Sequence, residues 1–274
     1  TMSIASDTAP EIDRLVWTIH RGVAPKHGAR LGELAAEIGL HFLDPFPVTA
    51  DFLLAAAATI DVICRRMPYR AAEAVTARLD DLEAMGLIDG RGGRLGATDR
   101  LRPLLETIRG CQADIAAANW TGNEGDRDTV AGLARKVGLA ASDDHVVAAV
   151  HRALPPVDDR FLSLYDRLVT LRYIRQHDHV VSWQAHGLTA PEMVTMTALW
   201  HGESVTDDED GLSPLAGRGW ASLDPVELTA AGRTVRDEIE AETNRRAQLS
   251  FDVLDEDEGE ALLSGLRALP GSGH

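Results

Sequence analysis

Apolar residues recur at helical spacing along most of the chain. In the segment 30–39, for example, Leu31, Leu34, Ala35 and Ile38 fall on one helical face. The same pattern, with capping residues at the starts and Gly or Pro at the ends, predicts helices over 10–20, 30–39, 50–66, 70–85, 99–118, 129–137, 143–153, 158–187 and 190–200. Strand signals are confined to two short hairpins, near 87–97 and 219–228. The predicted fold class is therefore all-α with small β wings.

Two breaks suggest how the chain is divided. The segment 119–128 is small and polar and contains two glycines, and Pro155-Pro156 interrupts the helical pattern again. We expect an N-terminal unit over 1–118, a helical linker region over 119–157 and a C-terminal unit over 158–274.

The two hairpins belong to an internal repeat. Each begins at a glycine, Gly86 or Gly219, and continues through a short apolar strand, a turn and a second strand. A leucine, Leu95 or Leu228, follows the glycine by nine residues in both cases, and a helix with Arg in its first turns comes next. A repeat of this kind predicts two copies of one structural unit.

Four segments carry a family resemblance: Glu83-Ala-Met-Gly-Leu-Ile-Asp89, Glu227-Leu-Thr-Ala-Ala-Gly-Arg233, 254–266 and 178–192. The first two resemble the end of the recognition helix and the wing of winged-helix proteins of the MarR type. The last resembles an actinobacterial group that carries two winged-helix units in one chain. This resemblance implies a tandem, pseudo-dimeric winged-helix fold, a DNA reader and a ligand pocket between helices. In that group a His and a Glu recur at positions matching His179 and Glu192.

Composition and charge limit the functions that fit. The 274 residues carry 27 basic and 43 acidic side chains, a net charge of −16, and residues 189–274 hold only 6 of the basic groups but 18 of the acidic ones. Such a chain differs from a general nucleic-acid binder, whose affinity comes from basic contacts to phosphate. Only two cysteines are present, which excludes a disulfide framework. The longest apolar run, 52–60, is too short to span a membrane, so we expect a cytoplasmic protein.

Candidate DNA contacts gather in the first unit. Four arginines precede or occupy the predicted 70–85 helix and two lie on the hairpin: Arg65, Arg66, Arg70, Arg78, Arg91 and Arg94. They would contact phosphate or groove edges. Alternatively they solvate helix faces and pair with Glu73, Asp80 and Asp81. The corresponding stretch of the second unit, 203–218, contains four consecutive acids together with Pro214 and Gly217, which predicts a degenerate reading element.

Candidate ligand contacts gather near the second unit. Residues at helical i, i+4 and i+7 share a face, and the next helix adds further groups; the six candidates are His179, Trp183, His186, Glu192, Met196 and Trp200. A mostly apolar pocket with a few polar groups is typical of a small-molecule site. The alternative is ordinary core packing with histidines at its rim. The sequence contains no signature of a catalytic, metal or cofactor site, so we expect none of these.

Two functions follow as hypotheses. The first is a ligand-responsive transcriptional regulator, monomeric or homodimeric, that binds duplex DNA mainly through its first unit. The second is a winged-helix scaffold that has lost DNA binding and binds or sequesters a small molecule, or less plausibly acts as an enzyme.

Overall fold

A computed structural model describes residues 3–41, 46–90, 93–205 and 210–271. Within these ranges the chain is mostly helical with two small antiparallel hairpins, which confirms the predicted fold class at that level. None of the described helices is long and apolar enough to cross a bilayer.

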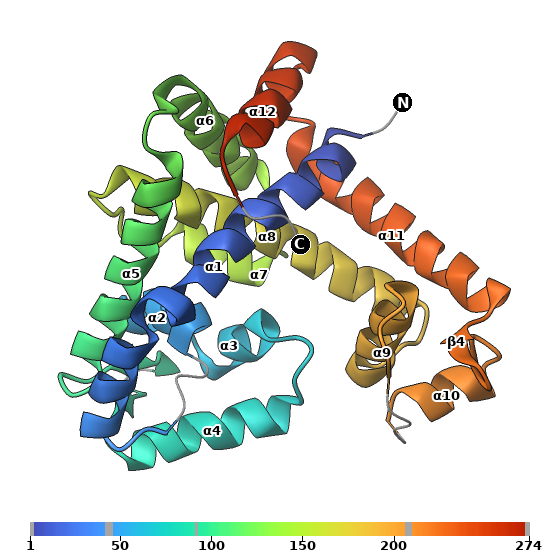
Figure 1. Ribbon diagram of the computed structural model, residues 1–274, viewed down its shortest axis with the longest axis horizontal. Coiled ribbons are helices and arrows are strands. Elements are labelled where there is room, and N and C mark those ends of the chain that lie inside the picture. The colour runs from blue at the N-terminus through green and yellow to red at the C-terminus, as the bar shows by residue number, and fades with distance from the viewer. Residues whose placement is uncertain (1–2, 42–45, 91–92, 206–209, 272–274) are drawn as a thin grey trace.

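Long helices form a central scaffold. In Figure 1 the helix α8 (Arg160–Ala185) runs through the centre and α1 (Ile4–Glu37) crosses it. Around them pack α5 (Arg102–Trp120), α6 (Glu124–Ala140), α7 (Val146–Arg152), α11 (Ala230–Phe251) and α12 (Glu256–Ala268). One hydrophobic cluster joins these helices and includes residues from both ends of the chain, from Ala5 to Leu269. The division into three sequence units remains a prediction.

A first arm projects below the scaffold at the left of Figure 1. It contains α2 (Phe46–Leu54), α3 (Ile60–Arg66), α4 (Ala72–Ala84) and the hairpin of β1 (Ile88–Asp89) and β2 (Gly96–Ala97). The apolar face of α4, with Val75, Leu79 and Leu82, is buried and belongs to the scaffold's hydrophobic cluster.

A second arm projects at the right of Figure 1. It contains α9 (Ala190–Trp200), α10 (Leu212–Gly217), β3 (Ala221–Leu223) and β4 (Val226–Leu228). These elements have a hydrophobic cluster of their own, which includes Trp183 near the end of α8 and Ile239 in the middle of α11.

The two hairpins begin and end with the same local geometry. Gly86 and Gly219 have φ angles of +67° and +74°, a region that glycine enters without steric cost. The hydroxyl of Thr98 donates to the carbonyl of Gly86 at 2.8 Å, and that of Thr229 donates to the carbonyl of Gly219 at 2.7 Å. Both hairpins predicted from the sequence are therefore present.

The strand register corrects the alignment of the repeat. Ile88 pairs with Ala97, and Ala221 pairs with Leu228. Leu228 is therefore equivalent to Ala97, not to Leu95, because the first hairpin is two residues longer. Leu95 instead donates its backbone N–H to the carbonyl of Ala58 at 2.8 Å.

Several predicted helix boundaries are wrong. The segments 10–20 and 30–39 form one helix, α1, which contains Pro10 and Pro25; its long buried face packs on α5, α8 and α12. The segment 50–66 is broken between α2 and α3, where Ala56 takes a φ of +48° and Ala58 pairs with the hairpin. The expected linker 119–128 is mostly helical, since only residues 121–123 separate α5 from α6.

Candidate nucleic-acid interface and ligand cavity

The helices that precede the two hairpins lie on the same side of the molecule. In Figure 1, α4 runs along the lower left and α10 along the lower right, both away from α6 and α12. Each arm therefore presents one helix on the side of the molecule facing away from α6 and α12.

The two exposed helices offer few positive charges. On α4, Arg78 is half-buried, whereas Glu73, Asp80, Asp81 and Glu83 are exposed. The six residues of α10 include no charged side chain. The second hairpin adds Asp224 and Glu227, and its Leu223 and Val226 are exposed. Phosphate contacts from the bodies of these helices would therefore be unfavourable or absent.

The arginines predicted to contact DNA separate into different environments. Arg70 and Arg94 are exposed, beside α4 and on the first hairpin respectively. Arg65 is also exposed, but its Nε donates to Asp61 at 2.8 Å. Arg91 lies outside the described residues.

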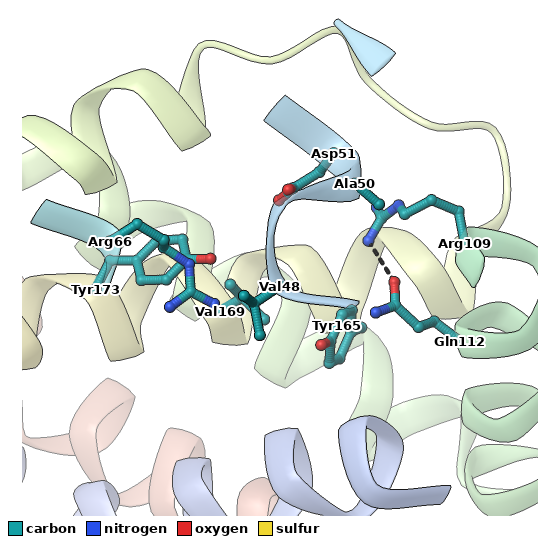
Figure 2. A pocket seen from close by; sticks show the side chains of 9 residues that line it. All are labelled: Val48, Ala50, Asp51, Arg66, Arg109, Gln112, Tyr165, Val169 and Tyr173. Atoms are coloured by element: carbon teal, nitrogen blue, oxygen red, sulfur yellow. Dashed lines mark hydrogen bonds between the residues drawn. The ribbon is translucent and has the colours of Figure 1, made fainter. Parts of the chain in front are cut away.

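Arg66 does not fit the predicted DNA contact, because its side chain points into the protein. Its guanidinium carbon lies 4.2 Å from the centroid of the Tyr173 ring, and its Nε is buried. Figure 2 shows it at a small polar pocket whose volume of about 10 Å³ accommodates roughly one water molecule. A guanidinium stacked on a buried ring cannot also reach DNA.

Other groups around this pocket join the first arm to the scaffold. Asp51, on α2, lies 2.9 Å from the Nε2 of His151 on α7. Burial alone would raise the pKa of Asp51, but the hydrogen bond and charge of His151 lower that pKa to about 2. Arg109, on α5, donates to Gln112 at 2.8 Å (Figure 2) and to both carboxylate oxygens of Asp166 on α8. These paired groups have a structural role at the base of the first arm.

A much larger cavity, about 860 Å³, lies between the arms. Helices α1, α8 and α11 form most of its wall. Tyr69, in the turn before α4, closes one side, and Trp200 and His201, at the end of α9, close the other. The cavity thus has residues from both arms in its lining.

The polar wall of this inter-arm cavity carries a surplus of positive charge. Arg175 and Arg236 both donate to the one carboxylate of Glu240, the latter at 2.8 Å. The Nε atoms of both arginines are buried and have no hydrogen-bond partner among the described residues. The side chain of Arg236 is only 9% exposed. These two buried N–H groups could therefore donate hydrogen bonds to an anionic ligand.

His179 contributes a neutral group to the same wall. Burial, followed by the charge of Arg236, lowers its pKa to about 4, so the ring is uncharged near neutral pH. The hydroxyl of Thr243 donates to the carbonyl of Ile239 at 2.7 Å and therefore accepts from the Nδ1 of His179 at 3.2 Å. That tautomer leaves Nε2 as an acceptor.

Comparison with known proteins identifies the family. The sequence profile of a helix-turn-helix family matches residues 104–271, which is more than half of the chain. The chain belongs to this helix-turn-helix family. No curated protein and no solved structure matches the sequence. The matched range runs from α5 to the end of α12; it contains the whole second arm and leaves out α2 to α4.

The ligand contacts predicted for this helix-turn-helix protein are not gathered in one place. Among the six, His179 and Trp200 line the inter-arm cavity. Trp183 and Met196 are buried in the cluster of the second arm. The predicted common face of His179, Trp183 and His186 is present, since His186 also faces α11, where its Nε2 lies 3.6 Å from the carboxylate of Glu238. The inter-arm cavity, however, adjoins only part of that face.

Glu192 has a structural role in place of the predicted one. Its Oε2 accepts from the backbone N–H of Thr189 in a capping box at the start of α9, and its Oε1 lies 3.1 Å from Arg218. Eight residues of helix, about 12 Å, separate it from Trp200 at the cavity. Glu192 therefore does not line the inter-arm cavity with His179.

Sequence reasoning missed the charged residues of the cavity. Arg236 and Glu240 stand four residues apart on α11, a spacing that predicts a helical ion pair. That signal is common on helix surfaces, and nothing in the sequence brings Arg175, 65 residues before Glu240, to the same carboxylate.

Proposed function

We propose that the chain is a ligand-responsive transcriptional regulator with two winged-helix units, and that it binds duplex DNA mainly through the first. The helix-turn-helix family is typical of DNA-binding regulators. The observation that carries the proposal is the placement of α4 and α10, each followed by a hairpin of matching geometry, on the same side of the scaffold.

The distribution of basic residues supports the first unit as the DNA contact. Arg70 is exposed just before the start of α4 and Arg94 is exposed on the first hairpin, positions from which they could reach phosphates beside a helix in the major groove. In the second unit, α10 has no cation and the hairpin has Asp224 and Glu227. DNA would thus be held from the start of α4 and from the first hairpin, since the body of this helix is acidic.

The inter-arm cavity supports a response to a ligand. Its wall combines Tyr69 of the first arm with Trp200 of the second. The Nε donors of Arg175 and Arg236, which have no hydrogen-bond partner in the part of the chain that the structure describes, favour an anionic group. A ligand that contacts both arms has different affinities for conformations that differ in arm position, which is the requirement for a shift in DNA affinity.

A salt-titrated binding assay with the DNA flanking the gene tests this function. For the wild type we expect log K to fall linearly with log salt, by about 0.9 for each phosphate contact. The double variant Arg70→Gln/Arg94→Gln should bind more weakly across sequences and reduce the magnitude of that slope by about 2. The control Arg267→Gln removes an exposed charge on α12, far from both arms, and should leave the slope unchanged.

One observation favours the second candidate, a scaffold that has lost DNA binding. Four acidic side chains are exposed on α4, against one half-buried arginine. If no duplex binds at low salt while a small molecule raises the melting temperature, the chain is a ligand-binding protein and the regulator proposal is wrong.

A further inference from the structure

A second cavity, of about 300 Å³, lies on the other side of the scaffold, among α6, α7 and α8. Arg135 and Leu139 line it from α6, Arg152 from the end of α7, and Arg167 from α8. The turn 154–157, which contains Pro155 and Pro156, closes it. None of its lining residues belongs to the inter-arm cavity.

The charges around this α6–α8 cavity are not balanced. Asp166 is the acidic residue in the lining, and both of its oxygens accept from Arg109, at 2.7 and 2.6 Å. Arg152 lies 2.5 Å from Asp143. Arg167 donates to the carbonyl of Ala131 at 2.8 Å, but within the described part of the chain neither Arg167 nor Arg135 has a carboxylate within 4.0 Å. Two positive charges therefore face the cavity uncompensated, in a chain whose net charge is −16.

The charge of Arg135 also disfavours the charged form of Arg167. Burial, followed by the charge of Arg135, lowers the pKa of Arg167. Leu139, one helical turn after Arg135 on α6, is 61% exposed, and the proline turn adds further apolar surface. The lining thus combines groups that favour a negative charge with groups that favour hydrocarbon.

We propose that the α6–α8 cavity binds a small amphiphilic carboxylate, with Arg135 and Arg167 holding the carboxylate and Leu139 and the proline turn covering its apolar chain. The volume is at the lower end of the range for small-molecule sites. A carboxylate accepts from two guanidinium groups and offsets the repulsion between them. The site also adjoins the base of the first arm, because His151 lines it and pairs with Asp51 of α2.

Titration calorimetry without DNA tests the proposal, with octanoate, octan-1-ol and octyl phosphate as probes. Octanoate should bind, and octan-1-ol, which has the same chain length but no charge, should bind at least ~10-fold more weakly, a difference of about 1.4 kcal/mol. Arg135→Gln and Arg167→Gln should each weaken octanoate binding by about 10-fold. Arg135 is exposed, so its variant should fold normally, which circular dichroism checks. The control Arg267→Gln should bind octanoate like the wild type.

Four results would overturn the assignment. The first is no octanoate binding, and the second is equal binding of octanoate and octan-1-ol, which would mean an apolar cleft without an anion site. Octyl phosphate binding in place of octanoate would mean a phosphate site. Weakening by Arg236→Gln but not by Arg135→Gln would place the ligand in the inter-arm cavity. Because DNA is absent from the assay, failure here leaves the regulator proposal standing, and the reverse also holds.

Discussion

Replacing Gly232 by alanine should destabilise the protein, although alanine is the better helix former. Gly232 lies in the first turn of α11, where its backbone N–H donates to the hydroxyl of Thr229, the N-cap residue. A Cβ at this position would lie 2.0 Å from the carbonyl oxygen of Trp220. That oxygen accepts from the backbone N–H of Thr229 at 3.0 Å, at the junction of the second hairpin. The hairpin and helix must therefore separate by about 1 Å to accommodate one methyl group.

The magnitude follows from three contributions. Loss or distortion of the hydrogen bond between Thr229 and Trp220 costs about 1 kcal/mol. Overpacking costs roughly 1–3 kcal/mol, and the helix propensity of alanine returns about 1 kcal/mol. The net loss in unfolding free energy is therefore about 1–3 kcal/mol, which lowers Tm by roughly 2–12 °C for a domain of this size.

Thermal and urea unfolding of Gly232→Ala measure the effect, and Gly132→Ala is the matched control. Gly132 is also inside a helix, α6, but a Cβ there meets no atom within 4 Å. The control should gain about 0.5–1 kcal/mol. If Gly232→Ala is as stable as Gly132→Ala, the close approach of the helix to the hairpin does not exist and the described junction is wrong.

Further predictions concern buried charges. His179 has a folded-state pKa of about 4, below its ordinary value of 6.5, so the unfolded chain binds the proton more tightly and stability should be lost as pH falls from about 6.5 towards 4. In His179→Gln the urea midpoint of unfolding should therefore change less with pH across that window than in the wild type. An unchanged pH profile would contradict this prediction. Asp51→Asn should cost about 3 kcal/mol in urea unfolding, because it leaves His151 without its buried partner. Asp61→Asn removes the exposed pair with Arg65 and should cost less than about 1 kcal/mol; equal costs would refute the structural role of Asp51.

The sequence predicted elements well where local signals agree with packing. The limits of α9 are those predicted, and the structure explains them by the capping box of Thr189 and Glu192 and by the short turn at Gly187. Prediction failed where packing overrides local preference. Two separate helices were predicted over 10–20 and 30–39, yet α1 continues through Pro10 and Pro25 because its buried face contacts α5 and α8.

The break between α2 and α3 was not predicted, for a different reason. The run around Ala56 contains neither Gly nor Pro, and its residues are apolar throughout, so periodicity could not locate the end of a helix.

The candidate sites depend on contacts that are distant in sequence. Periodicity placed His179, Trp183 and His186 on one face of α8, and all three do face α11 or the second arm's cluster. Which part of that face borders a cavity depends on how α11 crosses α8, and the sequence does not specify this. For the same reason Arg66 was counted among the DNA contacts: only the position of Tyr173, more than 100 residues later, shows that it points inward.

Hydrogen exchange of the full chain with and without saturating duplex tests the central claim most directly. Contact through the first unit predicts slower exchange of backbone amides in β1, β2 and the first turn of α4, near Arg70 and Arg94, when DNA is bound. The hairpin of β3 and β4 should exchange as it does in the free protein. Protection confined to β3, β4 and α10, or no protection in either arm at a salt concentration where DNA binds, would contradict the account.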